Sequence, residues 1–346
     1  SGSEKDHGEL EVQGIELAHE MFPTVLGKNV ELVYADNKSD ADVAASVAED
    51  LVEKKVSVVL GSHGSILSLV GGEYFTEAKI PAITVTSANP LVTSSNEYYF
   101  RTCFVESFQG IALAKYAVEQ AGTSKAAIFR DRDDDYAAAV SQTFTDKFIQ
   151  LTGDKNAIVR TVEYVSNQEN FKKKLQLIKD SGASAVLLAS KNADAIRIME
   201  QAKELGLQFM FLGTDKWESE EFLKEGGAAV EGAVFSTFFN PEAAITENTD
   251  VFLKAYREKY GKDAEPPSDV ALGFDAYLLA INAIEKAGTS VNGEAIKDKL
   301  AETKNFPGAA GKITFDENGD PIKSVAIQTV SNGKFVHIHT VEPTWQ

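Results

Sequence analysis

The sequence is poor in cysteine, in basic residues and in long apolar runs. Cys103 is the single cysteine among 346 residues, so the chain cannot form an internal disulfide. Lysine and arginine number 34 against 52 aspartates and glutamates, which gives a formal net charge of −18. Such a surface repels nucleic acid and anionic membranes, so we expect no nucleic-acid partner. No stretch approaches the roughly 18 apolar residues of a spanning helix, and we expect a soluble or already processed chain.

What the sequence has is an alternation of short β-rich runs with helical patterns, from residue 9 to about residue 237. The runs are nearly continuous in Val, Ile, Leu and Ala, which is typical of parallel strands covered by helices on both faces. The predicted fold class is therefore α/β, with doubly wound Rossmann-like sheets. The predicted strands are 29–36, 56–61, 81–87, 125–131, 157–165, 184–190, 209–215 and 232–239.

The alternation stops after the Asn240-Pro241 pair. Helix patterns follow one another there without a strand between them, which indicates that the chain leaves one sheet and completes another. We therefore predict two similar α/β lobes with several crossings of the chain. Asn-Gly pairs between β-patterned runs are typical of hairpin turns. The helices are predicted over 247–260, 267–287 and 292–303, and the hairpin turns at 318–319 and 332–333.

The first residues, "SGSEKDHGELEVQGIELAHEM", form a loop and then a helical pattern. A doubly wound domain normally opens on a strand that leads into its first loop. We therefore expect a first β-strand upstream of Ser1 that is missing here, or a chain whose order of elements has been altered.

The turn "GSHGS" at 61–65 follows a predicted strand and precedes a helical pattern, where helix amides can bind a small anion. A phosphate loop needs Gly-Lys-Ser/Thr, and no lysine is present. A serine nucleophile elbow needs Gly-x-Ser-x-Gly, but Ser62 directly follows Gly61. Two interpretations remain: a carboxylate seat in which Ser65 is the N-cap of the helix, or a plain capped turn.

Two further strand ends carry polar groups. The first is "TVTSANP" (84–90), where Thr86, Ser87 and Ala88 would lie beside the Ser65 turn if the two strands are neighbours. These residues are either a polar patch suited to a carboxylate or a simple turn closed by Asn-Pro. Asp215 ends the run "FMFLGTD", where it could accept a ligand ammonium or cap the helix near Glu218.

Other clusters favour no metal or catalytic chemistry. The acidic run 131–135 could bind Ca²⁺ but is better interpreted as a solvated loop, and 316–320 as a hairpin turn. His337 and His339 would share one face of a strand and could bind a metal only with a third ligand. With five histidines and no nucleophile–base pairing, we expect no catalytic residues, no cofactor and no metal.

Six stretches carry a family resemblance: "SGSEKDHGELEVQGIELA", "VVLGSHGS", "IPAITVTSANPLVT", "YYFRTCFVESFQGIALAKYA", "FLGTDKWESEEFLKEGG" and "GAAGKITFDENGDPIKSVAIQ". Over essentially its whole length, the chain resembles the type I periplasmic binding proteins of the branched-chain amino acid transport family. The resemblance implies two lobes joined by three crossings, with a ligand cleft between them that closes by a hinge. Lobe 1 would contain 1–106 and 239–322, and lobe 2 would contain 107–238 and 323–346.

The resemblance also implies roles for residues. Ser65, Thr86 and Ala88 would hold the α-carboxylate and ammonium of an amino acid, Asp215 would take the ammonium from the other lobe, and Tyr136 would cover the ligand. The family typically has Thr where this chain has Ala88, so one hydroxyl is lost. His7 and Lys191 or Asn192 replace aromatic residues of relatives and make the side-chain pocket more polar. Ser87, from the patch at 84–90, is also a candidate ligand-binding residue, and so are Phe104 and Trp217.

From this resemblance we expect a non-catalytic receptor of an ABC importer, binding a small amino acid or a more polar amino-acid-like compound. Its partner would be a transporter permease, and the receptor would be a monomer. It would work outside the cytoplasm with its signal peptide removed, in a periplasm or as a cell-surface lipoprotein. The alternatives are a ligand-sensing module of the same fold in signalling or regulation, and a Rossmann-like or hydrolase enzyme.

Overall fold

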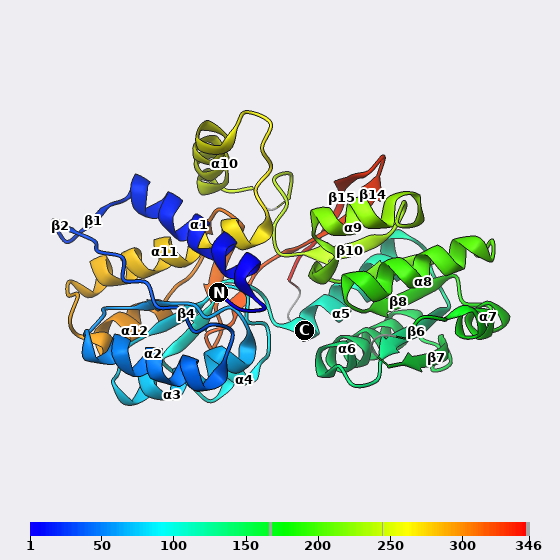
Figure 1. Cartoon of the computed structure of the whole chain (residues 1–346), viewed down its shortest axis with the longest axis horizontal. Coiled ribbons are helices and arrows are strands. Elements are labelled where there is room, and N and C mark those ends of the chain that lie inside the picture. Colours follow the sequence, from blue (N-terminus) through cyan, green and yellow to red (C-terminus); the bar gives the residue numbers. More distant parts are fainter. Residues whose placement is uncertain (166–167, 244, 344–346) are drawn as a thin grey trace. The chain divides into compact units, whose positions relative to one another are not determined.

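Short parallel strands followed by helices recur along the chain, as the predicted α/β alternation requires (Figure 1). The computed structural model describes residues 1–165, 168–243 and 245–343. The chain divides into unit 1, Ser1–Val105 with Phe238–Ser324, and unit 2, Glu106–Thr237 with Val325–Gln346. The backbone thus passes three times from one unit to the other. Within the described ranges no helix combines the length and apolarity that crossing a bilayer requires.

Unit 2 is built on one seven-stranded sheet, in the order β15-β14-β10-β9-β8-β6-β7. The strands from β10 to β7 run parallel, whereas β14 and β15 are antiparallel additions at one edge. All five residues of β8 are buried, because helices cover both faces of a parallel sheet. The strands are β6 (Ala126–Asp131), β7 (Ile158–Tyr164), β8 (Ala185–Ala189), β9 (Met210–Gly213), β10 (Val234–Thr237), β14 (Val325–Ser331) and β15 (Lys334–Val341).

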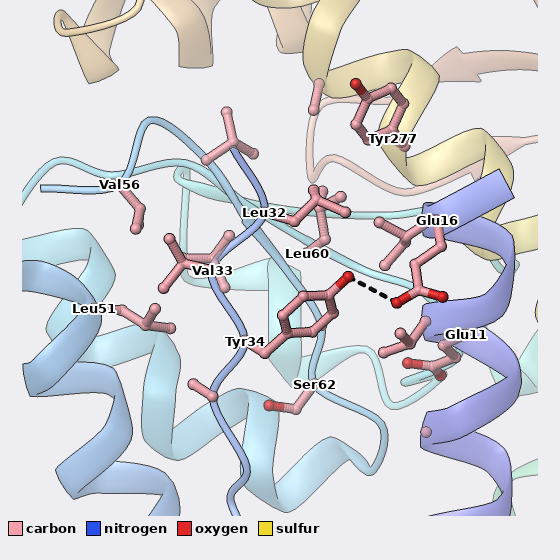
Figure 2. A pocket seen from close by; sticks show the side chains of 18 of the residues that line it. Glu11, Glu16, Leu32, Val33, Tyr34, Leu51, Val56, Leu60, Ser62 and Tyr277 are labelled. Carbon is pink, nitrogen blue, oxygen red and sulfur yellow. Dashed lines mark hydrogen bonds between the residues drawn. The ribbon is translucent and has the colours of Figure 1, made fainter. Parts of the chain in front are cut away.

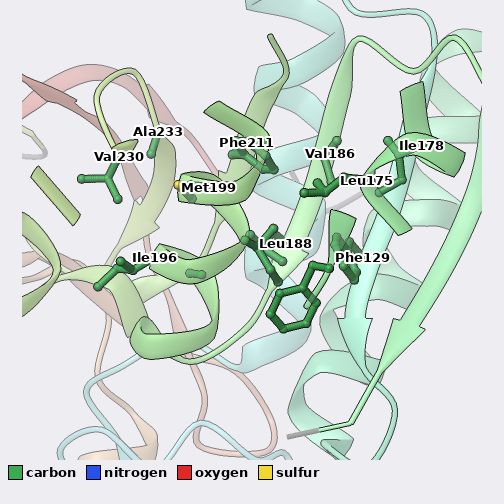
Figure 3. Close-up of a cluster of buried hydrophobic side chains, with 14 of the residues drawn as sticks. Phe129, Leu175, Ile178, Val186, Leu188, Ile196, Met199, Phe211, Val230 and Ala233 are labelled. Carbon is green, nitrogen blue, oxygen red and sulfur yellow. The ribbon is translucent and has the colours of Figure 1, made fainter. Parts of the chain in front are cut away.

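The helices of unit 2 bury one apolar face each against this sheet. Figure 3 shows Phe129 and Leu188 from neighbouring strands beside Met199 from a helix, in a core whose members are almost entirely buried. Such packing is the main source of the stability of the unit. The helices are α5 (Glu106–Lys115), α6 (Asp135–Thr152), α7 (Lys172–Asp180), α8 (Asn192–Glu204) and α9 (Glu220–Gly226), with a π-helix at Tyr116–Gln120 and 3₁₀ turns at Asp215–Trp217 and Gly227–Ala229.

Unit 1 has much less sheet. Its parallel sheet contains β3 (Val59–Leu60), β4 (Ala82–Thr84) and β5 (Tyr99–Arg101) in that order. A second, antiparallel sheet contains β11 (Phe306–Gly308), β12 (Gly311–Phe315) and β13 (Pro321–Ile322), and a small hairpin contains β1 (Thr24–Val25) and β2 (Lys28–Asn29).

The strand predicted over 29–36 is wrong in extent. Only Asn29 of that range belongs to a strand, where β2 pairs with β1, and residues 30–36 have no ladder. The sequence pattern describes a segment able to form a strand, but a strand also needs a neighbouring backbone with which to pair. Conversely, β5 was not predicted, because its three residues are too few to show a period.

The helices of unit 1 match the predicted patterns after residue 240. The helices predicted over 247–260, 267–287 and 292–303 are α10 (Glu247–Tyr260), α11 (Ser268–Ala287) and α12 (Gly293–Ala301). The others in this unit are α1 (Lys5–Met21), α2 (Ala41–Glu53), α3 (Ser65–Glu77) and α4 (Leu91–Ser94).

Helices α1 and α11 touch through two glycines. A Cβ on Gly14 would lie 2.0 Å from the carbonyl oxygen of Val270, and a Cβ on Gly273 would lie 2.3 Å from that of Glu11. Only glycine permits this backbone approach. The contact fixes the first turns of α1, which carry His7 and Glu11, against the start of α11.

Both Asn-Gly hairpin predictions are confirmed. Asn332 and Gly333 have φ of 53° and 68°, as a two-residue hairpin turn requires, between antiparallel β14 and β15. The acidic stretch 316–320 turns between antiparallel β12 and β13, where the Asp316 carboxylate accepts the amides of Asn318 and Asp320.

Candidate functional site

The ends of β3 and β4 in unit 1 are tied together by hydroxyl groups. Thr84, Ser68 and Ser87 each donate a hydroxyl hydrogen bond to the carbonyl oxygen of Ser62, over 3.0, 3.0 and 2.9 Å. The hydroxyls of Ser68 and Ser87 are also 2.9 Å apart. Because β3 and β4 are parallel neighbours, the turn at 61–65 and the turn at 84–90 lie side by side.

Ser65 is the first residue of α3 and not its N-cap, so that prediction is wrong. The N-cap is Gly64, whose φ of 88° suits glycine, and it supplies no side-chain cap. The Ser65 hydroxyl instead accepts a hydrogen bond from the Asn89 amide at 3.3 Å, which links the two turns again. The first amides of α3 have no acceptor within the helix, which is the geometry in which helix starts bind anions.

His63, Thr86 and Glu11 form a polar cluster next to these turns. The Thr86 hydroxyl contacts both the Glu11 carboxylate and Nδ1 of His63, the latter at 2.7 Å. Nδ1 of His63 lies 3.0 Å from Glu11, and Nε2 lies 3.3 Å from Glu4. Burial lowers the pKa of His63, but the hydrogen bond and charge of Glu11 outweigh it, and the net shift is upward.

His7 stacks on His63 with ring centroids 4.8 Å apart. Its Nδ1 lies 2.8 Å from the Asp269 carboxylate at the start of α11. This hydrogen bond raises the pKa of His7 from 6.5 to about 9 against the effect of burial. Near neutral pH the His7 ring is therefore an imidazolium.

Arg101 fixes the backbone that carries Ala88. Its side chain has no exposed surface and donates to the carbonyl oxygens of Ser87 and Asn89 over 2.7 and 3.0 Å. Its Nε lies 2.6 Å from the Asp320 carboxylate. Sequence reasoning did not select Arg101, although a charged residue within the apolar run "YYFRTCF" was a signal that could have revealed it.

Unit 2 has a separate polar cluster around Asp215, which follows β9. The Asp215 carboxylate accepts hydrogen bonds from the Tyr136 hydroxyl at 2.7 Å and from the Gln109 amide nitrogen at 2.6 Å. The Asp215 amide returns a bond to the Gln109 carbonyl oxygen at 3.2 Å. Helix α9 is capped by Ser219, whose hydroxyl accepts the Phe222 amide, so Asp215 is not the cap of that helix.

Gln109 is the organising residue of this cluster, and sequence reasoning missed it. It is fully buried on α5, and its carbonyl oxygen also accepts the Ser236 hydroxyl at 2.6 Å. A glutamine in the inward face of an apolar helix is the signal that could have identified it. Burial and then the charge of Asp215 raise the pKa of Tyr136 well above 10, so the phenol stays a donor.

The Lys216 side chain contacts both Tyr136 and the residue that caps its helix. Its ammonium lies 3.7 Å from the centre of the Tyr136 ring and 3.3 Å from the Asp134 carboxylate. Asp134 is itself the N-cap of α6, accepting the amides of Tyr136 and Ala137. The acidic run 131–135 therefore contains a helix cap, and this cap positions Tyr136.

The remaining candidates of unit 2 lie elsewhere. Lys191 is exposed at the N-cap of α8, and the next residue, Asn192, donates to the Ser219 hydroxyl at 2.8 Å. Trp217 is 0% exposed and stacks on Phe222 inside the core. In unit 1, Phe104 is 1% exposed and packs on Phe238. These two aromatic side chains are core residues in their own units.

His337 and His339 do lie two residues apart on β15, and Nε2 of His337 is 2.9 Å from the Thr340 hydroxyl. Over the residues that the structure describes, no three His, Cys, Asp or Glu side chains are grouped to hold a metal ion.

The two clusters offer opposite chemistry. Unit 1 presents hydroxyls, a helix start and a protonated imidazole, which can donate to a carboxylate. Unit 2 presents a carboxylate held in place by a buried amide and a phenol, which can accept from an ammonium.

A family model described as periplasmic binding protein matches residues 1–334. The chain is similar to a leucine-binding protein, LivK, of Thermotoga maritima, with 35% sequence identity and a TM-score of 0.86. The match covers 99% of this chain and 96% of that chain. It is also similar to the branched-chain amino acid transporter substrate-binding protein LivJ of Streptococcus pneumoniae, solved with isoleucine, with 30% sequence identity and a TM-score of 0.84. This match covers 99% of this chain and 97% of that chain. A Leu/Ile/Val-binding protein homolog of Brucella abortus is 26% identical over 325 residues, which cover 93% of this chain and 85% of that protein.

Proposed function

This chain belongs to the periplasmic binding protein family, and from that membership we propose that it is the non-catalytic solute receptor of an ABC importer. Its relatives are named as amino acid binding proteins, and LivJ as part of a branched-chain amino acid transporter. The receptor would work outside the cytoplasm and deliver its ligand to a membrane permease.

We further propose that the ligand is a small α-amino acid or a compound with the same zwitterion. The observation that carries this proposal is the Asp215 carboxylate, positioned by Gln109 and Tyr136 at the end of a parallel strand. Charge-assisted hydrogen bonds of this kind are about twice as strong as neutral ones. In the proposal, Asp215 of unit 2 takes a ligand ammonium, and Ser65, Thr86 and the Ala88 amide of unit 1 take a ligand carboxylate.

The side chain of the ligand is proposed to be more polar than leucine. His7 is cationic near neutral pH, and Lys191 and Asn192 are polar groups that follow a strand of unit 2. A calorimetric screen of leucine, isoleucine, valine, glutamine, aspartate and glutamate tests this. Tight binding of the three branched-chain amino acids without binding of the polar ones would refute the polar pocket and leave the receptor proposal standing.

The ammonium contact is tested with Asp215→Asn. Removing one partner of a desolvated charge pair should weaken the tightest ligand of the screen by about 2 kcal/mol or more, or roughly 30-fold in Kd. The same variant should bind the ligand's amine-free analogue as the unchanged protein does, because that analogue has no ammonium to lose. Calorimetry on both ligands measures the difference.

Asp146→Asn is the matched control, because Asp146 is exposed on α6 of the same unit. It should leave both affinities unchanged. If Asp215→Asn weakens the amino acid and its amine-free analogue equally, Asp215 only organises unit 2 and the ammonium assignment is wrong.

A further inference from the structure

Three polar side chains form a row across the carboxyl ends of neighbouring strands in unit 2. Asp131 is the last residue of β6, Tyr164 is the last residue of β7, and Ser190 directly follows β8. Asp131 is paired with Tyr164 in the register of β6 and β7, and Arg130 is paired with Ala189, so Ser190 comes opposite Asp131. Paired residues of parallel strands direct their side chains to the same face of the sheet. The three side chains therefore lie beside one another on one face.

That face carries the hydrophobic core of unit 2. Phe129 and Leu188 lie two residues before Asp131 and Ser190 on the same strands, and Figure 3 shows both in the core. Asp194, in the first turn of α8, adds a second carboxylate to the row. We call these four residues the strand-end cluster, and they are almost closed to solvent, with exposed fractions of 6% for Asp131, 2% for Tyr164, 1% for Ser190 and 7% for Asp194.

The Tyr164 hydroxyl is in contact with the other members of the cluster. Burial and then the charges of Asp194 and Asp131 raise the pKa of this phenol well above its ordinary value, and Ser190 lowers it, so the proton is retained. Among the residues that the structure describes, neither the Tyr164 hydroxyl nor the Ser190 hydroxyl has a hydrogen-bond partner of ordinary geometry. Buried polar atoms are nearly always paired in folded proteins, and an unpaired one indicates a bound water or ion.

The two carboxylates of the cluster are poorly compensated by the cations near Asp194. Burial raises the pKa of the Asp194 carboxyl, and the negative charge of Asp131 raises it further, because the two acids lie near each other. Arg197 and Lys191 lower the same pKa, but Arg197 is 3.6 Å away with its side chain 39% exposed, and Lys191 is exposed. Buried charges that repel each other require a counter-charge within the same buried space.

We propose that the strand-end cluster binds a Ca²⁺ ion. Its carboxylate and hydroxyl groups offer oxygen ligands alone, which Ca²⁺ accepts in a flexible geometry that water can complete. Mg²⁺ requires a near-ideal octahedron, and Zn²⁺ prefers nitrogen and sulfur ligands. The two carboxylates match the charge of Ca²⁺, and the hydroxyls replace the third acidic or histidine side chain of more familiar metal sites.

This site uses the acidic run 131–135 in a limited way. Asp131 is the one member of the run that belongs to the cluster, and its partners come from β7, from the end of β8 and from α8. The ion would join three strand ends to a helix start, so we expect it to stabilise unit 2. It would be separate from Asp215, whose carboxylate is bonded to Gln109 and Tyr136.

The test is Ca²⁺ binding to the full chain after treatment with a chelator, measured by calorimetry. We expect one ion per chain and a Tm that rises with the Ca²⁺ concentration, because the folded state alone holds the site. Tb³⁺ should occupy the same site and emit when tyrosine is excited, since a tyrosine ring lies beside it. Tyr164→Phe should abolish this emission.

Two substitutions that remove the same charge separate the cluster from the exposed loop. Asp194→Asn should weaken Ca²⁺ binding by about tenfold or more, because one of its two carboxylates is lost. Asp133→Asn is the matched control, since Asp133 lies in the same acidic run with its side chain 67% exposed. It should bind Ca²⁺ as the unchanged chain does.

A chain that binds neither Ca²⁺ nor Tb³⁺ would overturn the proposal, and the cluster would then hold an ordered water. Equal weakening by Asp133→Asn and Asp194→Asn would place the ion on the exposed loop and would also overturn it. Tb³⁺ emission that persists in Tyr164→Phe would place the ion beside another tyrosine, with the same consequence. The measurements contain no amino acid, so their failure leaves the proposed receptor function untouched.

Discussion

The sheets of the two units differ although their sequence patterns are alike. In unit 2, every predicted strand from 125–131 to 232–239 has a parallel neighbour and forms within a few residues of its expected bounds. In unit 1, the sheet stops at β3, and 29–36 stays unpaired beyond Asn29. Composition thus predicts which segments can be strands, and the presence of a pairing partner decides which of them become strands.

The polar clusters differ in a second way. In unit 1 the charged residues His7, Glu11 and Arg101 organise the polar groups, Arg101 through the backbone at 87–89, whereas Asp215 of unit 2 is positioned by the neutral groups of Gln109 and Tyr136. Breaking a buried charge pair leaves an uncompensated charge, while removing the Gln109 amide takes one neutral donor from the Asp215 carboxylate, which keeps the Tyr136 hydroxyl. The site residues of unit 1 should therefore be the more sensitive to substitution.

The largest effect is expected for Arg101→Leu, which leaves two backbone carbonyls without their donor and leaves the Asp320 carboxylate, which keeps its bond from the Thr93 hydroxyl, without its positive partner. We expect a loss of about 3–5 kcal/mol of unfolding free energy in unit 1. The matched change in unit 2, Gln109→Leu, should cost about 1–3 kcal/mol. Hydrogen exchange resolved by unit during urea denaturation measures both. Equal losses of unfolding free energy in the two variants would contradict the expectation that the charged Arg101 matters more for stability than the neutral Gln109.

Next in size is a pair of identical truncations in the two sheets. Leu188→Ala in β8 removes a side chain with no exposed surface and should cost about 3–4 kcal/mol. Leu60→Ala in β3 removes a partly exposed side chain that lines a cavity of 1430 Å³ within unit 1 (Figure 2), and it should cost about 2 kcal/mol or less. Urea unfolding of both variants checks the order. A larger cost for Leu60 would mean that the edge of β3 is as well packed as the centre of unit 2.

The smallest predicted effect is a dependence of stability on pH that comes from His7 in unit 1. The pKa of His7 is raised from 6.5 to about 9 by its hydrogen bond to Asp269. Its contribution to stability is therefore complete below about pH 6.5 and is lost as the pH rises to about 9. Because His7 is exposed, the contribution should be below about 1 kcal/mol. Tyr136 keeps its proton over the same range, since its pKa is raised well above 10.

Melting temperatures from pH 6 to 9.5 for the unchanged chain, His7→Gln and Asp269→Asn provide the measurement. Either substitution should flatten the decline above pH 6.5. Parallel curves for all three proteins would show that the imidazolium adds no stability.

Local sequence signals predicted the elements that depend on local causes. The helix over 247–260 was placed to the residue, and both Asn-Gly turns were found, because periods and turn residues act over a few positions. The prediction of Ser65 as the N-cap is wrong by one residue, because the N-cap position has a positive φ that Gly64 adopts. The roles of Gln109 and Arg101 could not be predicted from local sequence. Gln109 contacts Asp215 and Ser236, and Arg101 contacts Asp320, more than a hundred residues away in each case.

The reactivity of the single cysteine can report on the opening of unit 1 separately from unit 2. Cys103 is fully buried in unit 1, and unit 2 contains no cysteine. A thiol reagent can reach it only when unit 1 opens, so the labelling rate of the unaltered chain measures the opening frequency of that unit alone. An exposed cysteine introduced elsewhere could be labelled quickly with a dye while Cys103 stays unmodified, which makes the protein convenient for fluorescence detection of a bound solute.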